Sequence, residues 1–385
     1  MELHPAIGIW IHSRISAKEQ IFSIHGLFAL EQISCRCQKD VDSFGFLSVF
    51  GYGYGYGYGY GYGWWRFSSL KIAEIVKGLF AWKDGTEKMS PLCGCAAGAW
   101  AGYLYVLGGF SRGRAIANMW RYDPRTNEWQ ESTPMYAPRA YCKTAILNDK
   151  LYALGGVDKT TGSGMGGSLM PLKSAEVYDP VADLWRPIPN MPFSKAQTLP
   201  SPIVDHMLKP IATGIASFRG KLCVPQSLYS WPFFVDVGGE VFDPSSESWV
   251  EMPKGMGEEW PAKQAGTKLS VVVNGSLYAL DPTSSSLDGS KIKVYDEESD
   301  SWKVVLTKVP IILDFSDSES PYLLAGFKTR LHVVTKDIND CIVVLRAEAD
   351  NVSTSSSASE TESWKIVARK KFGSVELVTC QVLEV

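Results

Sequence analysis

One stretch decides the fold: Tyr178-Asp-Pro-Val-Ala-Asp-Leu-Trp185, in which an aromatic residue is followed at once by aspartate and seven positions later by tryptophan. The pattern recurs in Tyr122-Asp-Pro-Arg-Thr-Asn-Glu-Trp129, Phe242-Asp-Pro-Ser-Ser-Glu-Ser-Trp249 and Tyr295-Asp-Glu-Glu-Ser-Asp-Ser-Trp302. The four tryptophans follow one another at intervals of 56, 64 and 53 residues. Self-similarity at a nearly constant period indicates an array of similar structural units.

Each copy of this stretch predicts a turn between two β-strands. The aspartate side chain can accept hydrogen bonds from the backbone that follows it, and proline, present in three of the copies, fixes φ. The aromatic residue and the tryptophan then lie on the flanking strands, where large rings can pack against neighbouring sheets. The repeated structural positions are Tyr122, Asp123, Trp129, Tyr178, Asp179, Trp185, Phe242, Asp243, Trp249, Tyr295, Asp296 and Trp302.

A second recurrent element precedes each of these stretches and predicts a hairpin. Its apolar runs begin at Leu104, Leu151, Leu222 and Leu277, and a short turn comes before each: Ala101-Gly102, Asn148-Asp149, Arg219-Gly220 and Asn274-Gly275. Such dipeptides between apolar runs are typical of tight β-turns. The first two runs end in glycine pairs, which accept unusual dihedrals and a close neighbouring backbone; these are Gly108, Gly109, Gly155 and Gly156.

The units therefore read as four short antiparallel strands each. A degenerate fifth copy follows, with strands expected at 323–327, 331–334, 341–345 and 364–368. With this pattern the sequence resembles the kelch-repeat family over about residues 92–385, and the resemblance implies an all-β propeller of four-stranded blades round a central channel. The recurring Gly, Tyr, Asp and Trp residues then build blades, and none of them is expected to be catalytic.

Longer runs resemble one branch, the plant F-box/kelch-repeat proteins. They include 89–95, 174–180, 209–214, 224–234, 260–267 and 318–325. The resemblance implies a substrate receptor of an SCF-type ubiquitin ligase, in which an N-terminal F-box docks the ligase adaptor and the propeller holds the protein target.

The beginning of the chain departs from that family. Residues 1–90 contain no Leu-Pro pair and no sustained helical periodicity, so no F-box is recognisable, and five blades are readable where the family has six. We expect an irregular N-terminal region over 1–68, a short helical linker over 69–90 with an amphipathic pattern at 71–80, and the propeller over 91–385. The adaptor is an expected partner only if the full-length form carries an F-box. In the family the strand-like tail at 375–385 would join the first blade; without that blade it either closes a five-bladed ring or leaves an exposed strand edge.

Residues 51–63 are seven glycines alternating with six tyrosines. One interpretation is a self-associating low-complexity element. The other is that residues 1 to about 68 are not an evolved domain, because a strict dipeptide repeat is what a hexanucleotide microsatellite would encode. Under the second hypothesis the chain is a truncated or mis-spliced form, which the 5′ sequence of the transcript tests.

Two groups of residues are candidates for contacting the target, since propellers bind through loops at the ends of their strands. Arg139 and Lys195 each lie ten residues after a tryptophan, and Lys263 lies fourteen after Trp249. A ring of basic residues suits an acidic peptide or a phosphorylated degron; solvated rim charges are the alternative. The second group is the aromatic stretch with Tyr229, Trp231 and Phe233, which suits an interface or packing over a blade edge.

Composition narrows the remaining classes of function and location. The chain has 385 residues, 45% of them hydrophobic, and a net charge of −3, so no basic excess points to nucleic acid. Residues 1–25 show no secretory signal and no apolar run is long enough for a membrane span, so we expect a soluble protein of the cytoplasm or nucleus. The eight cysteines include two C-x-C pairs, for which reduced thiols are favoured over a zinc site.

An enzyme is not expected. Only five histidines occur, none has Asp four residues before it, and neither Gly-x-Ser-x-Gly nor a P-loop stands in a strand–helix context. The expected function is protein binding without cofactor or metal, as the target-recognition part of an F-box-type ligase receptor. A stand-alone kelch scaffold is the alternative, and a metalloenzyme is a distant third.

Overall fold

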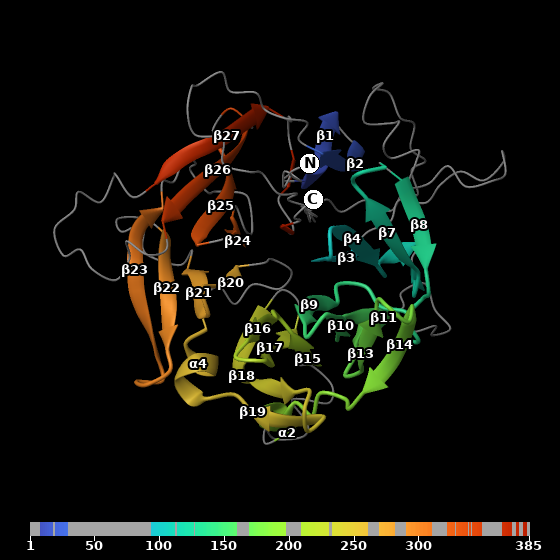
Figure 1. The fold of residues 1–385 in the computed structure, drawn as a ribbon, viewed down its shortest axis with the longest axis vertical. Helices are drawn as coiled ribbons and strands as arrows, with labels where there is room; N and C mark the ends of the chain where they lie inside the picture. Colours follow the sequence, from blue (N-terminus) through green and yellow to red (C-terminus); the bar gives the residue numbers. More distant parts are fainter. Residues whose placement is uncertain are drawn as a thin grey trace.

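Five antiparallel sheets surround a common centre in the computed structural model of this protein (Figure 1). The described residues are 8–17, 20–29, 94–111, 114–126, 128–159, 169–197, 209–230, 233–260, 269–281, 290–309, 322–327, 329–337, 339, 341–348, 364–371, 375–376 and 380–382.

Each sheet is one blade, and its strands follow one another from the centre outward. Blade 1 holds β3 (Ala96–Trp100), β4 (Tyr103–Leu107), β7 (Met119–Asp123) and β8 (Glu128–Ser132). Blade 2 holds β9 (Lys143–Leu147), β10 (Lys150–Leu154), β13 (Ala175–Asp179) and β14 (Leu184–Ile188). Blade 3 holds β15 (Lys209–Ala212) and β16 (Ala216–Phe218), which both pair with β17 (Lys221–Ser230), followed by β18 (Phe233–Asp243) and β19 (Ser248–Glu251).

Blade 4 holds β20 (Ser270–Val273), β21 (Ser276–Asp281), β22 (Ser290–Asp296) and β23 (Ser301–Val309). Blade 5 holds β24 (Leu323–Phe327), β25 (Arg330–Lys336), β26 (Cys341–Glu348) and β27 (Lys365–Lys371). Two short helices, α2 (Ser194–Gln197) and α4 (Lys254–Glu258), lie between blades. The predicted all-β propeller with five readable blades is confirmed.

The predicted turns form as the residue pattern requires. The dipeptides Ala101-Gly102, Asn148-Asp149, Arg219-Gly220 and Asn274-Gly275 all have positive φ, as type I′ hairpins require. In the outer turns the aspartate accepts backbone N–H groups: Asp179 Oδ1 lies 3.0 Å from the nitrogen of Val181, and Asp243 Oδ1 lies 2.9 Å from that of Ser245. These bonds explain why Asp occupies the same place in every copy.

The repeated aromatic and tryptophan residues are cross-strand partners. Tyr178 pairs with Trp185 in the register of β13 and β14, with ring centroids 5.2 Å apart; Phe242 and Trp249 repeat the arrangement at 5.0 Å. Each indole also reaches the preceding blade, since Nε1 of Trp185 donates to Thr133 O at 2.9 Å. Trp249 donates in the same way to Pro189 O at 2.7 Å. The tryptophans thus join successive blades.

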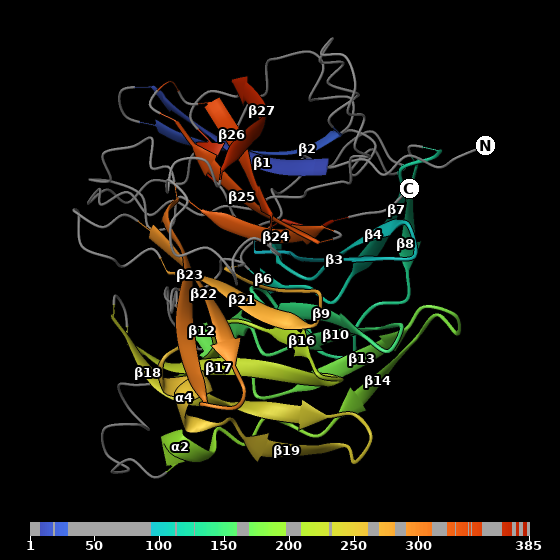
Figure 2. The same cartoon turned by 60° about the vertical axis from the view of Figure 1, so that its left-hand side comes forward.

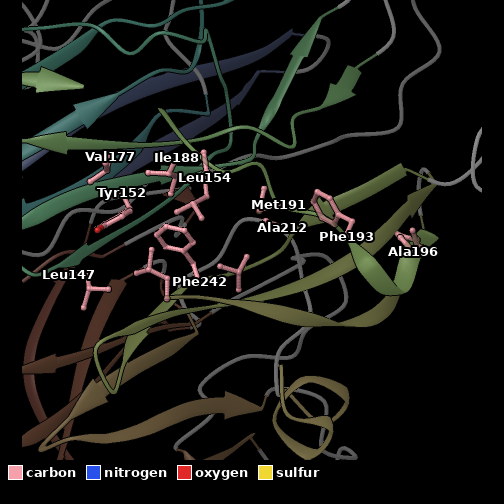
Figure 3. Packing of buried hydrophobic residues seen from close by; sticks show 14 residues of the cluster. Leu147, Tyr152, Leu154, Val177, Ile188, Met191, Phe193, Ala196, Ala212 and Phe242 are labelled. Carbon is pink, nitrogen blue, oxygen red and sulfur yellow. The ribbon is translucent and has the colours of Figure 1, made fainter. Parts of the chain in front are cut away.

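The hydrophobic core is divided into layers between adjacent blades. Figure 3 shows the layer between blades 2 and 3, where Tyr152 and Leu154 of β10 face Phe242 of β18. Separate clusters fill the other spaces between described blades, from Tyr105 with Trp185 between blades 1 and 2 to Leu280 with Leu331 between blades 4 and 5. Burial of apolar area between neighbouring sheets stabilises the ring by about 25 cal/mol per Å².

Replacing the interblade indole donor tests this arrangement. We expect Trp185→Phe to lower the free energy of unfolding by about 1–3 kcal/mol, because the ring is largely kept while the carbonyl of Thr133 loses its donor. Chemical denaturation followed by circular dichroism measures the change. Leu184→Ala on the same strand is the control, since Leu184 is 61% exposed; an equal loss in both variants would contradict the role of the indole.

The two ends of the ring differ. Because the strands are antiparallel, the hairpin turns and the Asp-containing turns lie at one end, which we call the turn face. The longer β4–β7, β10–β13 and β17–β18 connections and the connections between blades lie at the other end, the loop face. In Figure 2 the turn between β13 and β14 and the end of the β17–β18 hairpin point to opposite sides.

The end of the chain links the last blade to the first. The thiol of Cys380 donates to Leu324 O of β24 at 3.3 Å, and Nε2 of Gln381 donates to Ala97 O of β3 at 2.7 Å. Earlier in the tail, β28 (Val375–Glu376) pairs with β1 (Gly8–Ala17), which forms a hairpin with β2 (Gln20–Ala29). This three-stranded sheet occupies the gap between blades 5 and 1 in Figure 1.

The sequence predicts an irregular region over residues 1–68, and the β1–β2 hairpin is the part of this region that the structure describes. The Gly-Tyr tract, the helix expected over 71–80 and the predicted domain boundaries at 68 and 90 lie outside the described residues.

Candidate target-binding face

Three β-ribbons stand side by side on the loop face of blades 1 to 3. The first pairs β5 (Phe110–Ser111) with β6 (Arg114–Ala115), and the second pairs β11 (Val157–Lys159) with β12 (Leu169–Pro171). The third is the end of the long β17–β18 hairpin, which β15 extends on its inner side. Strand β6 contacts β11, and β12 contacts β15. Loop-face connections of three consecutive blades therefore form one continuous surface.

A small apolar cluster holds these ribbons together. The rings of Phe110 and Tyr141 meet edge to face with centroids 5.9 Å apart, and Ala140 forms a β-bridge with Val157. The cluster contains Phe110, Ala115, Ala140, Tyr141, Val157 and Ile211. Because it draws on blades 1, 2 and 3, it fixes the relative position of their ribbons.

Arg139 lies in the interior, not on the exposed basic ring that its spacing suggested. Its side chain is 0% exposed, and it forms an ion pair with Glu176 of β13. Nη1 donates to Gly155 O at 3.0 Å and to Ser174 O at 2.9 Å. Ten residues after Trp129 the chain has already entered the space between blades 1 and 2, where a charged group must be paired. Arg139 therefore holds two blades together and offers no charge to a target.

The other two predicted basic residues differ from Arg139 and from each other. Lys195 lies on α2, is partly exposed, and its Nζ lies 3.1 Å from Oε1 of Glu251 on β19. Its charge is therefore already compensated by a carboxylate of blade 3. Lys263 lies outside the described residues. Arg139 and Lys195 thus do not share one exposed basic surface, and contact of Lys195 or Lys263 with a target stays a prediction.

The predicted aromatic stretch is the tip of the third ribbon. The backbone of Tyr229 pairs with that of Phe234, and Phe233 pairs with Ser230 across the same hairpin. Trp231, between them, lies outside the described residues. Strands β17 and β18 have ten and eleven residues, against five in β4 and β7, so this hairpin extends beyond the body of its blade. Its contact with a target stays a prediction.

Charge is distributed unequally between the two faces. Near the turn face of blades 1 to 4, six described cations contact a carboxylate; the pairs are Arg125–Asp123, Lys150–Asp179, Arg186–Glu247, Arg219–Glu297, Lys221–Asp243 and Lys303–Asp296. On the loop face Arg114 and Lys173 are exposed and Lys143 is half-buried, and none of the three contacts a carboxylate among the described residues. The loop face of blades 1 and 2 thus carries three cations without a carboxylate partner among the described residues.

Two buried glutamates that sequence reasoning missed organise this end of the ring. Glu176 accepts backbone N–H groups of Tyr136 at 2.7 Å and Ala137 at 3.0 Å. Glu240 occupies the same place in blade 3 and accepts from Ser194 N at 2.8 Å and Gln226 Nε2 at 2.7 Å. Both stand two residues before the repeated aromatic, in Glu-Val-Tyr-Asp-Pro and Glu-Val-Phe-Asp-Pro. Alignment of the repeats could have found them.

Nothing in the described residues suggests other site chemistry. No three His, Cys, Asp or Glu side chains converge there as a metal ion would require. Burial raises the pKa of the Cys142 thiol to about 11 and that of Cys223 to about 12, which disfavours the reactive thiolate. In the part of the chain that the structure describes, no helix is long and apolar enough to cross a membrane.

Comparison with known proteins agrees with this architecture. The Kelch motif family matches residues 91–136 and 138–192. An F-box/kelch-repeat protein of Arabidopsis thaliana is 54% identical over 82% of this chain and 69% of its own length. The F-box protein AFR of Arabidopsis thaliana is 30% identical over 48% of this chain and 41% of its own. Kelch-like protein 23 of Homo sapiens is 27% identical over 52% and 39%, respectively.

The fold and its joined loop-face ribbons define a kelch-type β-propeller, which is a protein-interaction domain. The identity with the first Arabidopsis relative places the chain more closely: it belongs to the plant F-box/kelch-repeat family.

Proposed function

We propose that this propeller holds target proteins for ubiquitination, as the target-recognition part of an SCF-type ubiquitin-ligase receptor. The observation that carries the proposal is the 54% identity with an F-box/kelch-repeat protein over 82% of the chain. The continuous ribbon surface of blades 1 to 3 supports it, because it offers a target several rigidly connected loops. The ligase adaptor is a partner of whichever form of the protein carries an F-box, and cytoplasm or nucleus is the proposed location.

Affinity purification from plant cells tests this function. The protein is tagged at its C-terminus at its natural locus, so that its natural length is kept, and is purified after the proteasome has been inhibited. We expect the ligase adaptor and a cullin to be recovered together with ubiquitinated proteins, and cells expressing the tag alone are the control. Repeated recovery of bound proteins without adaptor and cullin would contradict the ligase role and favour a stand-alone kelch scaffold.

A further inference from the structure

Lys143 departs from the repeat at a place where every other blade is uncharged. It stands five residues before the first hairpin turn of blade 2, and the same position in blades 1, 3, 4 and 5 is held by Ala96, Gly214, Leu269 and Leu323. Ala96, Leu269 and Leu323 are buried. A charged residue at an otherwise apolar or small position opposes the local pattern, and such departures are expected mainly at functional sites.

The position of Lys143 means that its charge lowers the stability of the fold but can bind an incoming carboxylate. It is the first residue of β9, the innermost strand of blade 2 (Figure 1). Because the β9–β10 hairpin turn lies on the turn face, Lys143 lies at the loop-face end of this strand. Ala145 and Leu147, on the same side of β9, pack toward blade 3, which places the stem of Lys143 between the two blades. Burial lowers the pKa of its amine to about 8, because desolvation disfavours the ammonium.

No group of the described chain compensates that charge, although the described structure provides partners for comparable groups elsewhere. Buried Arg139 has Glu176, and Lys150 of the same blade has Asp179. An ammonium held partly out of water without a carboxylate lowers the stability of the fold. The same ammonium binds an incoming carboxylate more strongly than a fully solvated one would, since less water is displaced and the dielectric is lower.

We propose that Lys143 receives a carboxylate from an acidic segment of the target protein, with Arg114 and Lys173 as flanking cations on the loop face. This inference rests on the protein-binding function proposed above and names the chemistry of the segment that is bound. Arg114 belongs to β6 of the first ribbon, and Lys173 follows β12 of the second, in the β4–β7 and β10–β13 connections. Their exposure lets an extended acidic chain pass over blades 1 and 2 while one side chain enters the centre.

Selection of peptides on the purified full-length chain tests the proposal. A random dodecapeptide library displayed on phage is selected separately on the wild type, on Lys143→Gln and on Lys150→Gln, and the best wild-type peptide is then titrated by fluorescence anisotropy. We expect enrichment of Asp and Glu on the wild type and on Lys150→Gln but not on Lys143→Gln. The chosen peptide should bind Lys143→Gln about tenfold more weakly, the loss expected for one hydrogen-bonded charge pair.

A stability measurement separates a binding role from a structural one. Lys143→Met keeps the stem and removes the charge, so we expect it to raise the melting temperature. It should also lower the affinity for the acidic peptide, as Lys143→Gln does. Lys150→Met is the matched control and should not raise it, because that lysine is paired and exposed. Selected peptides without acidic enrichment, or equal affinity of the acidic peptide for Lys143→Gln, would overturn the proposal.

The outcome is distinguishable from that of the proposed function. Recovery of adaptor and cullin from cells does not depend on Lys143, so the variant Lys143→Gln should still purify with the ligase. Enrichment of acidic peptides without recovery of adaptor and cullin would support this inference and contradict the ligase role. Recovery of adaptor and cullin, together with equal peptide affinity of Lys143→Gln and the wild type, would support the ligase role and overturn this inference.

Discussion

Arg139→Met is expected to lower the free energy of unfolding by about 3–5 kcal/mol, the cost of removing one partner from a buried ion pair. Glu176 is 2% exposed, and without the guanidinium its charge would keep only the backbone donors of Tyr136 and Ala137. The carbonyls of Gly155 and Ser174 would lose a donor as well. Because many domains have a total stability of only 5–15 kcal/mol, the midpoint of urea denaturation should fall clearly.

Two further variants identify the cause of that loss. Arg139→Met combined with Glu176→Gln removes both charges, so it should recover part of the stability lost in the single variant. Arg186→Met breaks the exposed pair with Glu247 and should change stability by about 1 kcal/mol or less. A single variant Arg139→Met as stable as the wild type, with peptide binding lost, would restore the surface role that the sequence spacing suggested.

The architecture of this ring could be predicted from local chemistry because each local signal has one structural meaning. Asn274-Gly275 accepts the positive φ of a type I′ turn. The aromatic residue, the Asp and the Trp of each copy lie within seven positions of one another, so the turn and the aromatic cross-strand contact form within one hairpin. The number of readable blades follows from repetition of such hairpins, and the structure confirms five.

The candidate site could not be predicted in the same way, because burial and charge compensation depend on residues distant in sequence. Arg139 and Glu176 are 37 residues apart, and nothing around Arg139 distinguishes a buried arginine from a rim arginine. The isolation of Lys143 is visible only when the partners of every neighbouring charge are known. Sequence spacing thus predicted an exposed role for Arg139, whereas the structure buries its side chain between blades 1 and 2.

Gly108→Ala is expected to destabilise the propeller by about 2–5 kcal/mol, adding backbone strain of 1–2 kcal/mol to the cost of displacing a neighbour. Gly108 has φ +64°, and a Cβ at this position would lie 2.1 Å from the carbonyl oxygen of Arg139. That oxygen accepts the N–H of Gly109 at 2.9 Å, so the connection cannot move aside without breaking the bond. The strain therefore falls on the segment that carries Arg139 between blades 1 and 2.

Gly220→Ala is the matched control, because Gly220 has φ +71° and nothing lies within 4 Å of its added Cβ. It should cost about 1–2 kcal/mol, from the left-handed backbone alone. Gly108→Ala should displace the segment at 139–143 and so weaken the binding of acidic peptides that depend on Lys143. Gly220→Ala on the turn face should leave this binding unchanged. Urea denaturation and peptide titration measure the two effects on the same samples. Equal losses of stability in the two variants would show that Gly108 is required for its left-handed backbone conformation alone, and not for the close approach of blades 1 and 2.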